Sequence, residues 1–111
     1  MAAYIPQKGD FVALTFDPQS GHEQRGRRPA LVVSNDLFNK HTGMCIACPI
    51  TSTHRVYPFH VVIPEGQKVS GVVMVEQVKS IDFRSRDVRR IASAPTAVLE
   101  EVLSILDACI Y

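Results

Sequence analysis

The 111-residue sequence has almost no net charge, no long hydrophobic run and few cysteines. The formal charge is only +1, from 12 basic and 11 acidic residues, so the overall charge does not indicate a nucleic-acid binder. No apolar stretch approaches the roughly 20 residues that a membrane-spanning helix needs. The N-terminus also lacks the charged-then-apolar layout of a secretory signal. We therefore expect a single domain, residues 1–111, with no membrane association and a cytoplasmic location.

The three cysteines do not indicate a disulfide framework. Cys45 and Cys48 form a C-x-x-C pair, but they lie in the apolar segment 44–50, which we expect to be a strand. Residues three apart on a strand point to opposite faces of the sheet. The sequence has no second C-x-x-C and no nearby pair of histidines. We therefore expect no metal and no cofactor, and we place both cysteines in the core.

Short apolar segments separated by turn residues predict a mainly β protein. The expected strands are residues 11–16, 29–34, 44–50, 57–63 and 72–78, with 79–83 extending or adding to the last. Residues 35–43 are turn-rich and suit one short helical turn. From Pro95, apolar residues recur at the spacing of one helix face, at Val98, Leu99, Val102, Leu103, Leu106, Cys109 and Ile110. The pattern predicts a small, strongly curved antiparallel barrel or sheet with a C-terminal α-helix.

Polar side chains are concentrated in the loop before the second expected strand. They are Glu23, Gln24, Arg25, Arg27 and Arg28, followed by Pro29. The block matches neither a metal site nor a Walker-type phosphate loop. Arginine can bind phosphate bidentately and stabilise charge on a phosphoryl group, and a nearby glutamate can orient it or handle a proton. Composition alone supports a phosphate-facing site and a salt-bridged surface loop equally.

Two other groups of polar residues are interpreted as surface features. A second basic run is typical of a solvated face; it consists of Arg84, Arg86, Arg89 and Arg90. Three histidines could share acid–base chemistry with the loop: His22, His54 and His60. Nothing in the sequence pairs them, so surface or strand positions are favoured for each.

Several blocks of the sequence, in order and at matching spacing, resemble the MazF/PemK (Kid) family of toxin endoribonucleases from bacterial toxin–antitoxin systems. The blocks are GDFVALTFDP, G-x-EQ-x-G-x-RP-A-L-V-V-S, NKHTGMC, CPITS, YPFHVVI, GVVMVEQVKSID and the C-terminal helix. The resemblance implies an SH3-like antiparallel barrel with a C-terminal helix, assembled as a homodimer. It also implies a metal-independent endoribonuclease that cleaves single-stranded RNA, including mRNA, at a short sequence. The reaction is attack by the ribose 2′-hydroxyl, which leaves 2′,3′-cyclic phosphate and 5′-hydroxyl ends.

The resemblance assigns catalysis to Arg28 and Thr51, because the Arg-Pro register selects Arg28 and places Arg27 at the variable position before it. Arginine is a poor base, since its pKa lies above about 12, so we expect Arg28 to stabilise charge. Glu23 is either a catalyst or the group that orients Arg28. The RNA-binding residues that the family implies are Phe16, Gln24, Asn35, Asn39 and Gln77. Phe16 shares a strand face with Val12 and Leu14, so a core position is equally open for it.

The resemblance further implies a partner, a MazE-like antitoxin whose acidic, disordered tail wraps the toxin dimer and competes with RNA. Two other functions stay open: a gyrase-poisoning toxin of the related CcdB type, and a catalytically inactive barrel that only binds a partner. The Glu-Gln-x-Gly-x-Arg-Pro block and Thr51 favour RNA cleavage, because a protein-binding toxin needs neither. Residues 51–57 and His60 depart from other members, which leaves the recognition sequence open.

Overall fold

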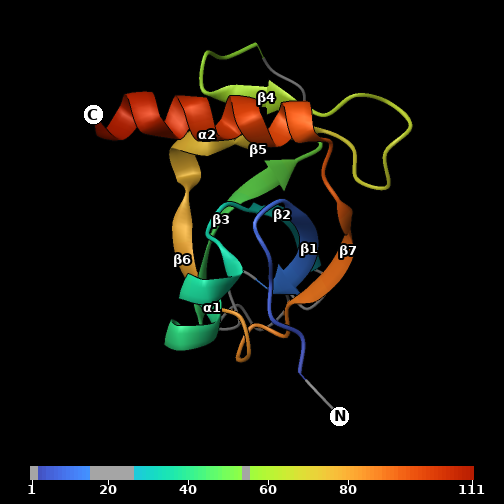
Figure 1. Cartoon of the computed structure of the whole chain (residues 1–111). Helices are drawn as coiled ribbons and strands as arrows, with labels where there is room; N and C mark the ends of the chain where they lie inside the picture. The colour runs from blue at the N-terminus through green and yellow to red at the C-terminus, as the bar shows by residue number, and fades with distance from the viewer. Residues whose placement is uncertain (1–2, 16–26, 54–55) are drawn as a thin grey trace.

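The computed structural model describes residues 3–15, 27–53 and 56–111, and these residues form a seven-stranded antiparallel sheet with two α-helices (Figure 1). The strands are β1 (Asp10–Thr15), β2 (Arg27–Val32), β3 (Met44–Thr51), β4 (His60–Val62), β5 (Val72–Met74), β6 (Lys79–Asp82) and β7 (Arg89–Ser93). The helices are α1 (Asp36–Thr42) and α2 (Thr96–Ile110), and a 3-10 helix, η1 (Val75–Gln77), follows β5. The expected mainly β fold with a C-terminal helix is confirmed.

Strand β3 is the centre of the sheet because it pairs with three other strands. Its first half pairs with β6, its middle with β2, and its last two residues, Ile50 and Thr51, with β5. The strand order is β4-β5-β3-β2-β1-β7, with β6 also beside β3. The pairings do not join β4 to β7, so within the described ranges the sheet is open. Of the barrel and the curved sheet that the sequence left open, the structure has the sheet.

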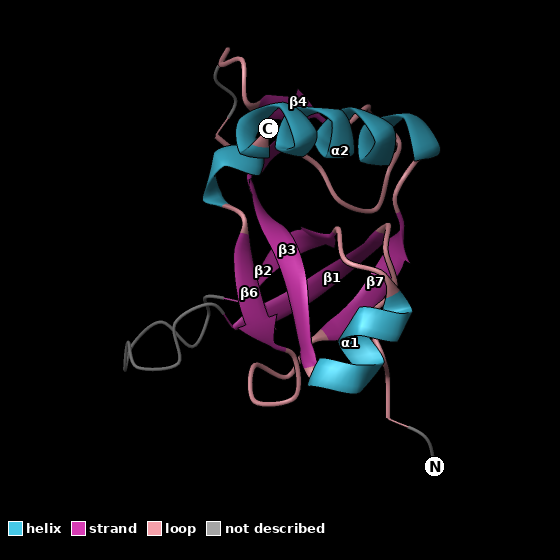
Figure 2. Ribbon diagram, turned by 60° about the vertical axis from the view of Figure 1, so that its left-hand side comes forward, coloured by secondary structure: helices cyan, strands magenta, loops and turns pink. Residues whose placement is uncertain are grey.

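Alternating side chains form two apolar clusters, one on each face of the sheet. On one face, Phe11, Leu31 and Cys48 pack with Val98 and Val102, the buried residues of α2. The other face carries Val12, Leu14, Ala30, Val32, Cys45, Ala47, Ile81, Phe83 and Val88. Helices α2 and α1 lie at opposite ends of the sheet (Figures 1 and 2). The C-terminal helix α2 therefore packs on the sheet through its predicted apolar face.

The elements differ from the sequence expectation where polar residues or proline interrupt an apolar run. The run 72–78 leaves the sheet at Val75, turns through η1 and re-enters as β6. The expected strand 57–63 is shortened because a turn brings the His60 N–H to the Tyr57 carbonyl, 3.0 Å away. Strand β7 was not expected at all, since an edge strand that begins with two exposed arginines has no apolar alternation to reveal it. The predicted apolar face of α2 includes Ile110, but this residue is 72% exposed in the last turn, so the packed face of the helix ends before it.

The second basic run lies on the surface and holds strand edges together. Arg86 donates to the Thr15 carbonyl over 3.1 Å, and the Arg90 guanidinium lies 3.5 Å from the Asp10 carboxylate. Asp10 is buried, and it also accepts from the Tyr4 hydroxyl and the Gln7 N–H. Burial and the hydrogen bond to Asp10 raise the pKa of Tyr4. These contacts explain the run as a structural feature of the β1–β7 edge.

Cys45 and Cys48 lie in the two different apolar clusters, which confirms their expected positions on opposite faces of β3. Burial raises the pKa of the Cys45 thiol to about 11 and that of Cys48 to about 12. Both thiols therefore stay protonated at neutral pH, and the protonated thiol is a poor nucleophile. Cys109 in α2 is exposed.

In a Cys109→Ser variant, the two remaining thiols are expected to react with a disulfide reagent only as fast as the protein unfolds. The measurement is the rate of absorbance change with and without denaturant, and the unsubstituted protein provides the exposed-thiol reference. Rapid labelling of the native variant would contradict the buried placement of both cysteines.

Candidate active site at the end of strand β3

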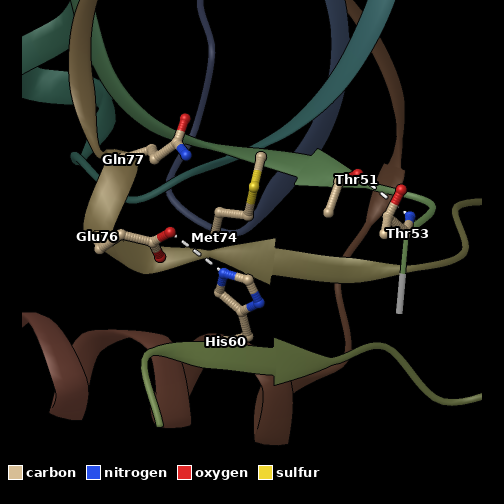
Figure 3. Close-up of a pocket in the computed structure, with 6 residues that line it drawn as sticks. All are labelled: Thr51, Thr53, His60, Met74, Glu76 and Gln77. Carbon is tan, nitrogen blue, oxygen red and sulfur yellow. Dashed lines mark hydrogen bonds and ion pairs between the residues drawn. The ribbon is translucent and has the colours of Figure 1, made fainter. Parts of the chain in front are cut away.

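A polar pocket of about 300 Å³ opens where β3, β4, β5 and η1 meet (Figure 3). Its lining consists of Thr51, Thr53, His60, Met74, Glu76 and Gln77. In Figure 3, Thr51 and Thr53 lie toward one end of the pocket, Glu76 and Gln77 toward the other, and Met74 between them. The lining offers two hydroxyls, an imidazole, a carboxylate and an amide around one thioether.

Strand register brings these side chains to one face. Thr51 pairs with Val72, and two residues along β5 Met74 pairs with His60, so Thr51, Met74 and His60 point the same way. The chain then enters η1, where buried Val75 anchors the turn and leaves Glu76 and Gln77 exposed at the rim. The pocket therefore follows from the pairing of β3, β4 and β5.

Thr51 is held by a short local contact. Its hydroxyl oxygen accepts from the Thr53 backbone N–H over 3.2 Å, which fixes the side-chain rotamer. No acceptor within the described ranges takes the hydroxyl hydrogen of Thr51, so this group is available as a donor to a ligand. The backbone at Gly71 packs directly against the Thr51 carbonyl. Only glycine allows this close approach, because a Cβ at position 71 would lie 2.2 Å from the Thr51 carbonyl oxygen.

His60 and Glu76 form the second polar pair of the pocket. Their Nε2 and Oε2 atoms are 3.2 Å apart, and the two side chains are 8% and 32% exposed. A carboxylate only accepts, so Nε2 carries the hydrogen, and in the neutral ring Nδ1 is then an acceptor. Nδ1 is buried and has no hydrogen-bond partner among the residues the structure describes. The Tyr57 ring packs edge-on against the imidazole, with centroids 4.9 Å apart.

Arg28 and Arg27 have different environments, although they are neighbours in β2. Arg27 donates to the carbonyls of Asp87 (2.7 Å), Arg86 (3.4 Å) and Ala13 (3.3 Å). Arg28 is exposed and makes no such contact with any other described residue. Among the described residues, the fold thus uses Arg27 and leaves Arg28 available to a ligand.

The register of β2 and β3 relates Arg28 to the pocket. Ala30 pairs with Pro49, the last pair in the β2–β3 register, and Arg28 and Thr51 each lie two residues beyond that pair on their own strands. Opposed residues of antiparallel strands share one face of the sheet. Arg28 and Thr51 are therefore placed on the same face, at the same edge of the β2–β3 pair.

The structure gives different positions to the other residues singled out in the sequence. Gln77 lines the pocket with Thr51. Asn35 is exposed and caps α1, because its side chain accepts from the Phe38 N–H over 2.9 Å. Asn39 is fully buried, and its amide donates to the Pro6 and Ser34 carbonyls. Because the Asn39 side chain is buried and hydrogen-bonded within the fold, it is not accessible for the RNA contact that was expected of it.

Three further candidates, Phe16, Glu23 and Gln24, lie outside the described residues, as do His22 and His54. Conversely, sequence reasoning did not select Glu76, and it favoured a plain strand position for His60. The pairing of the two depends on the β4–β5 register, and no local pattern signals it. No cluster of three metal-ligating side chains occurs in the described segments. None of the helices described has the length and apolarity to span a bilayer.

Comparison with known proteins shows likeness over nearly the whole chain. Residues 7–110 match the family described as PemK-like, MazF-like toxin of type II toxin–antitoxin system. Endoribonuclease toxin MazF of Escherichia coli strain K12 is 41% identical over 108 residues, covering 97% of this chain and 93% of that protein. Endoribonuclease toxin ChpB of the same strain is 43% identical over 109 residues, covering 94% and 93%.

Solved structures give the same result. A crystal structure of MazF from Deinococcus radiodurans superposes with a TM-score of 0.87 at 47% identity, covering 97% of this chain and 98% of that chain. A MazE–MazF crystal structure from the same organism has a TM-score of 0.86 at 42% identity, with 97% of both chains covered. The fold, the sequence and the length of the chain are thus all similar to those of the MazF proteins compared.

Proposed function

The chain belongs to the PemK-like, MazF-like toxin family, and on this premise we propose that it is the endoribonuclease toxin of a type II toxin–antitoxin system. The proposed substrate is single-stranded RNA, including mRNA, cut at a short sequence with loss of translation and growth. Residues 1–111 act as a single toxin domain in the cytoplasm. The observation that supports the proposal most is the polar pocket at the end of β3, which is lined by both Thr51 and Gln77.

The proposed reaction is an internal transfer at phosphorus that needs no metal. The 2′-oxygen loses its proton and forms a bond to phosphorus, the bond from phosphorus to the 5′-oxygen breaks, and the leaving oxygen gains a proton. Negative charge accumulates on the phosphoryl oxygens between these steps. A guanidinium fork and a hydroxyl donor are suited to that charge, so Arg28 and Thr51 take this role. Glu23 is proposed as the auxiliary carboxylate that orients Arg28 or takes a proton.

RNA binding is assigned to one residue of the pocket and to further residues outside it. Gln77 carries both a donor and an acceptor and lines the pocket, so it can read a base edge. Asn35 is exposed at the start of α1 and offers a second polar contact. Phe16 and Gln24 complete the proposed set on the strength of the family resemblance.

The proposed partners are a second copy of the chain and a MazE-like antitoxin with an acidic, disordered tail. MazE–MazF complexes from Deinococcus radiodurans support the antitoxin. An apolar groove of about 280 Å³ beside the end of α2 offers surface for a protein partner; it is lined by Tyr57, Phe59, Val75, Glu76, Val78, Leu106, Cys109 and Ile110. Exposed apolar patches of this kind often mark protein interfaces.

The proposed function is tested by incubating the purified protein with a long single-stranded RNA in EDTA and sequencing the cut ends. Discrete cuts with 5′-hydroxyl and cyclic phosphate ends are expected. Intact RNA, beside DNA gyrase stalled by the same preparation, would instead identify a gyrase poison. Intact RNA with no effect on gyrase would identify an inactive binding module.

A Thr51→Val variant is expected to cleave about 10²-fold more slowly, because it keeps the shape of the side chain and loses the hydroxyl donor. Thr51→Ser restores the donor and should recover most of the rate. Thr53→Val removes the other hydroxyl of the pocket and serves as the matched control. Single-turnover rates on one oligonucleotide measure all three variants. Equal losses in Thr51→Val and Thr53→Val would remove Thr51 from its proposed role.

A further inference from the structure

The His60–Glu76 pair is not used by the chemistry proposed for Arg28 and Thr51, yet it occupies the same pocket. The His60 side chain is only 8% exposed, and its Nδ1 atom has no partner in the described part of the chain. Such an atom costs stability, because a buried polar atom has lost its hydrogen bonds to water. The pair is also built rigidly. Strand pairing with Met74 fixes the His60 backbone, the Tyr57 ring packs on the imidazole, and Nε2 donates to Glu76.

The consequence of this arrangement is an oriented carboxylate. The His60 Nε2 atom occupies Oε2 of Glu76, and no described residue donates to Oε1. Glu76 is an exposed residue with a long side chain, so without His60 this side chain would sample several rotamers. Held by His60, it presents one free acceptor at the rim of the pocket, beside the amide of Gln77 and the thioether of Met74.

The remaining lining matches what an RNA base requires. Unstacked bases are recognised by contact of their faces with polarizable or apolar side chains and by hydrogen bonds to their edges. Met74 supplies a polarizable surface between the two polar ends of the pocket. A volume of about 300 Å³ lies at the small end of ligand pockets, which suits a single base better than a longer segment.

We infer that the His60–Glu76 pair reads one base of the substrate, with the fixed carboxylate of Glu76 accepting a hydrogen bond from an exocyclic amino group. This inference rests on the proposed function and adds a specificity determinant to it. Cytosine, adenine and guanine carry such an amino group. Uracil has no amino group, and its single N3–H donor lies between two carbonyl oxygens that a carboxylate repels. The subsite beside Thr51 therefore disfavours uracil, and His60 is a positioning residue that acts through Glu76.

The burial of His60 argues against a direct role in proton transfer. Its Nδ1 atom is enclosed, and its Nε2 atom faces Glu76. A general acid or base must reach the 2′-oxygen or the leaving oxygen within hydrogen-bond distance. Neither nitrogen is presented to a phosphate, so orientation of Glu76 is the role the geometry supports.

The test is cleavage of a randomised RNA library, followed by sequencing of the ends to give base frequencies at each position around the cut. The unsubstituted protein should disfavour uracil at one position near the cut. In Glu76→Gln the amide can also donate, so uracil acceptance at that position should rise about tenfold, with other positions unchanged. His60→Ala should weaken the same preference, and His60→Gln, which restores a donor, should recover part of it.

Matched controls remove the same groups from the surface. The controls are Glu65→Gln and His41→Ala, because Glu65 and His41 are exposed and lie outside the pocket. Both variants should leave the base frequencies around the cut unchanged. If the unsubstituted protein cuts no RNA, the proposed function itself fails. If it cuts and the Glu76 and His60 variants keep its base profile, the inference is overturned. Uniform loss of cutting at every site in a folded His60→Ala variant would also overturn it, because the pair would then act in the chemistry.

Discussion

RNA cleavage is expected to fall about 10³-fold in an Arg28→Ala variant, with the fold and its melting temperature unchanged. Removal of one preorganised donor to a developing oxyanion costs about 10²–10³ in rate, and a guanidinium provides two such donors together with a charge. Arg28 is exposed and holds no other described part of the fold, so its loss should not affect stability. Single-turnover cleavage and thermal melting of the same preparation measure the two quantities.

The neighbouring Arg27 is the natural control, because it has the same side chain and a different environment. Arg27→Ala should retain most of the cleavage rate and lose about 1–3 kcal/mol of stability, since its guanidinium donates to three backbone carbonyls of β1 and the loop before β7. Arg28→Lys keeps the charge but not the fork and should recover only part of the activity. If Arg27→Ala is as inactive as Arg28→Ala while still folded, the assignment of Arg28 is wrong.

A Gly71→Ala variant is expected to lose about 3 kcal/mol of stability and most of its activity. Gly71 has φ +119°, a conformation that strains any other residue, and the added methyl would lie 2.2 Å from the Thr51 carbonyl oxygen. Relief of that clash requires β5 to move away from the end of β3, where Thr51 pairs with Val72. Denaturant unfolding gives the free-energy change, and the cleavage assay reports the displacement of Thr51.

Gly66 separates the two causes of this effect. It also has a positive φ, +93°, but a Cβ there would meet no atom within 4 Å. Gly66→Ala should therefore cost only the backbone strain, about 1 kcal/mol, and leave cleavage intact. Equal destabilisation by the two substitutions would show that the approach of Gly71 to Thr51 is unimportant.

The parts of the fold that the sequence predicted are those with a local signal. The helix periodicity after Pro95 predicts α2, and the spacing of Cys45 and Cys48 predicts their burial on opposite faces. Strand β7 lacks such a signal, because an edge strand needs no apolar alternation. The departure of Val75 from the sheet also cannot be seen in the sequence, since it depends on how β5 fits between β3 and β4.

The candidate site divides in the same way. Arg28, Thr51 and Gln77 could be selected by resemblance, but their placement depends on the registers of β2, β3 and β5, which span long loops. Asn39 carries the same side-chain chemistry as Asn35, and only burial separates their roles. The pairing of His60 with Glu76 joins positions 16 residues apart through strand contacts, so no spacing rule could have revealed it.

The pocket is assembled from segments that are distant in the chain, and this has a consequence during synthesis. Strands β4 and β5 lie between Thr51 and Gln77 in the chain, and the two residues meet only after β4 and β5 have paired. Contacts of long sequence separation form late and slowly. A nascent chain that ends before Gln77 cannot contain the pocket. The proposed endoribonuclease site is thus absent from the growing chain until the ribosome has translated the codon for Gln77.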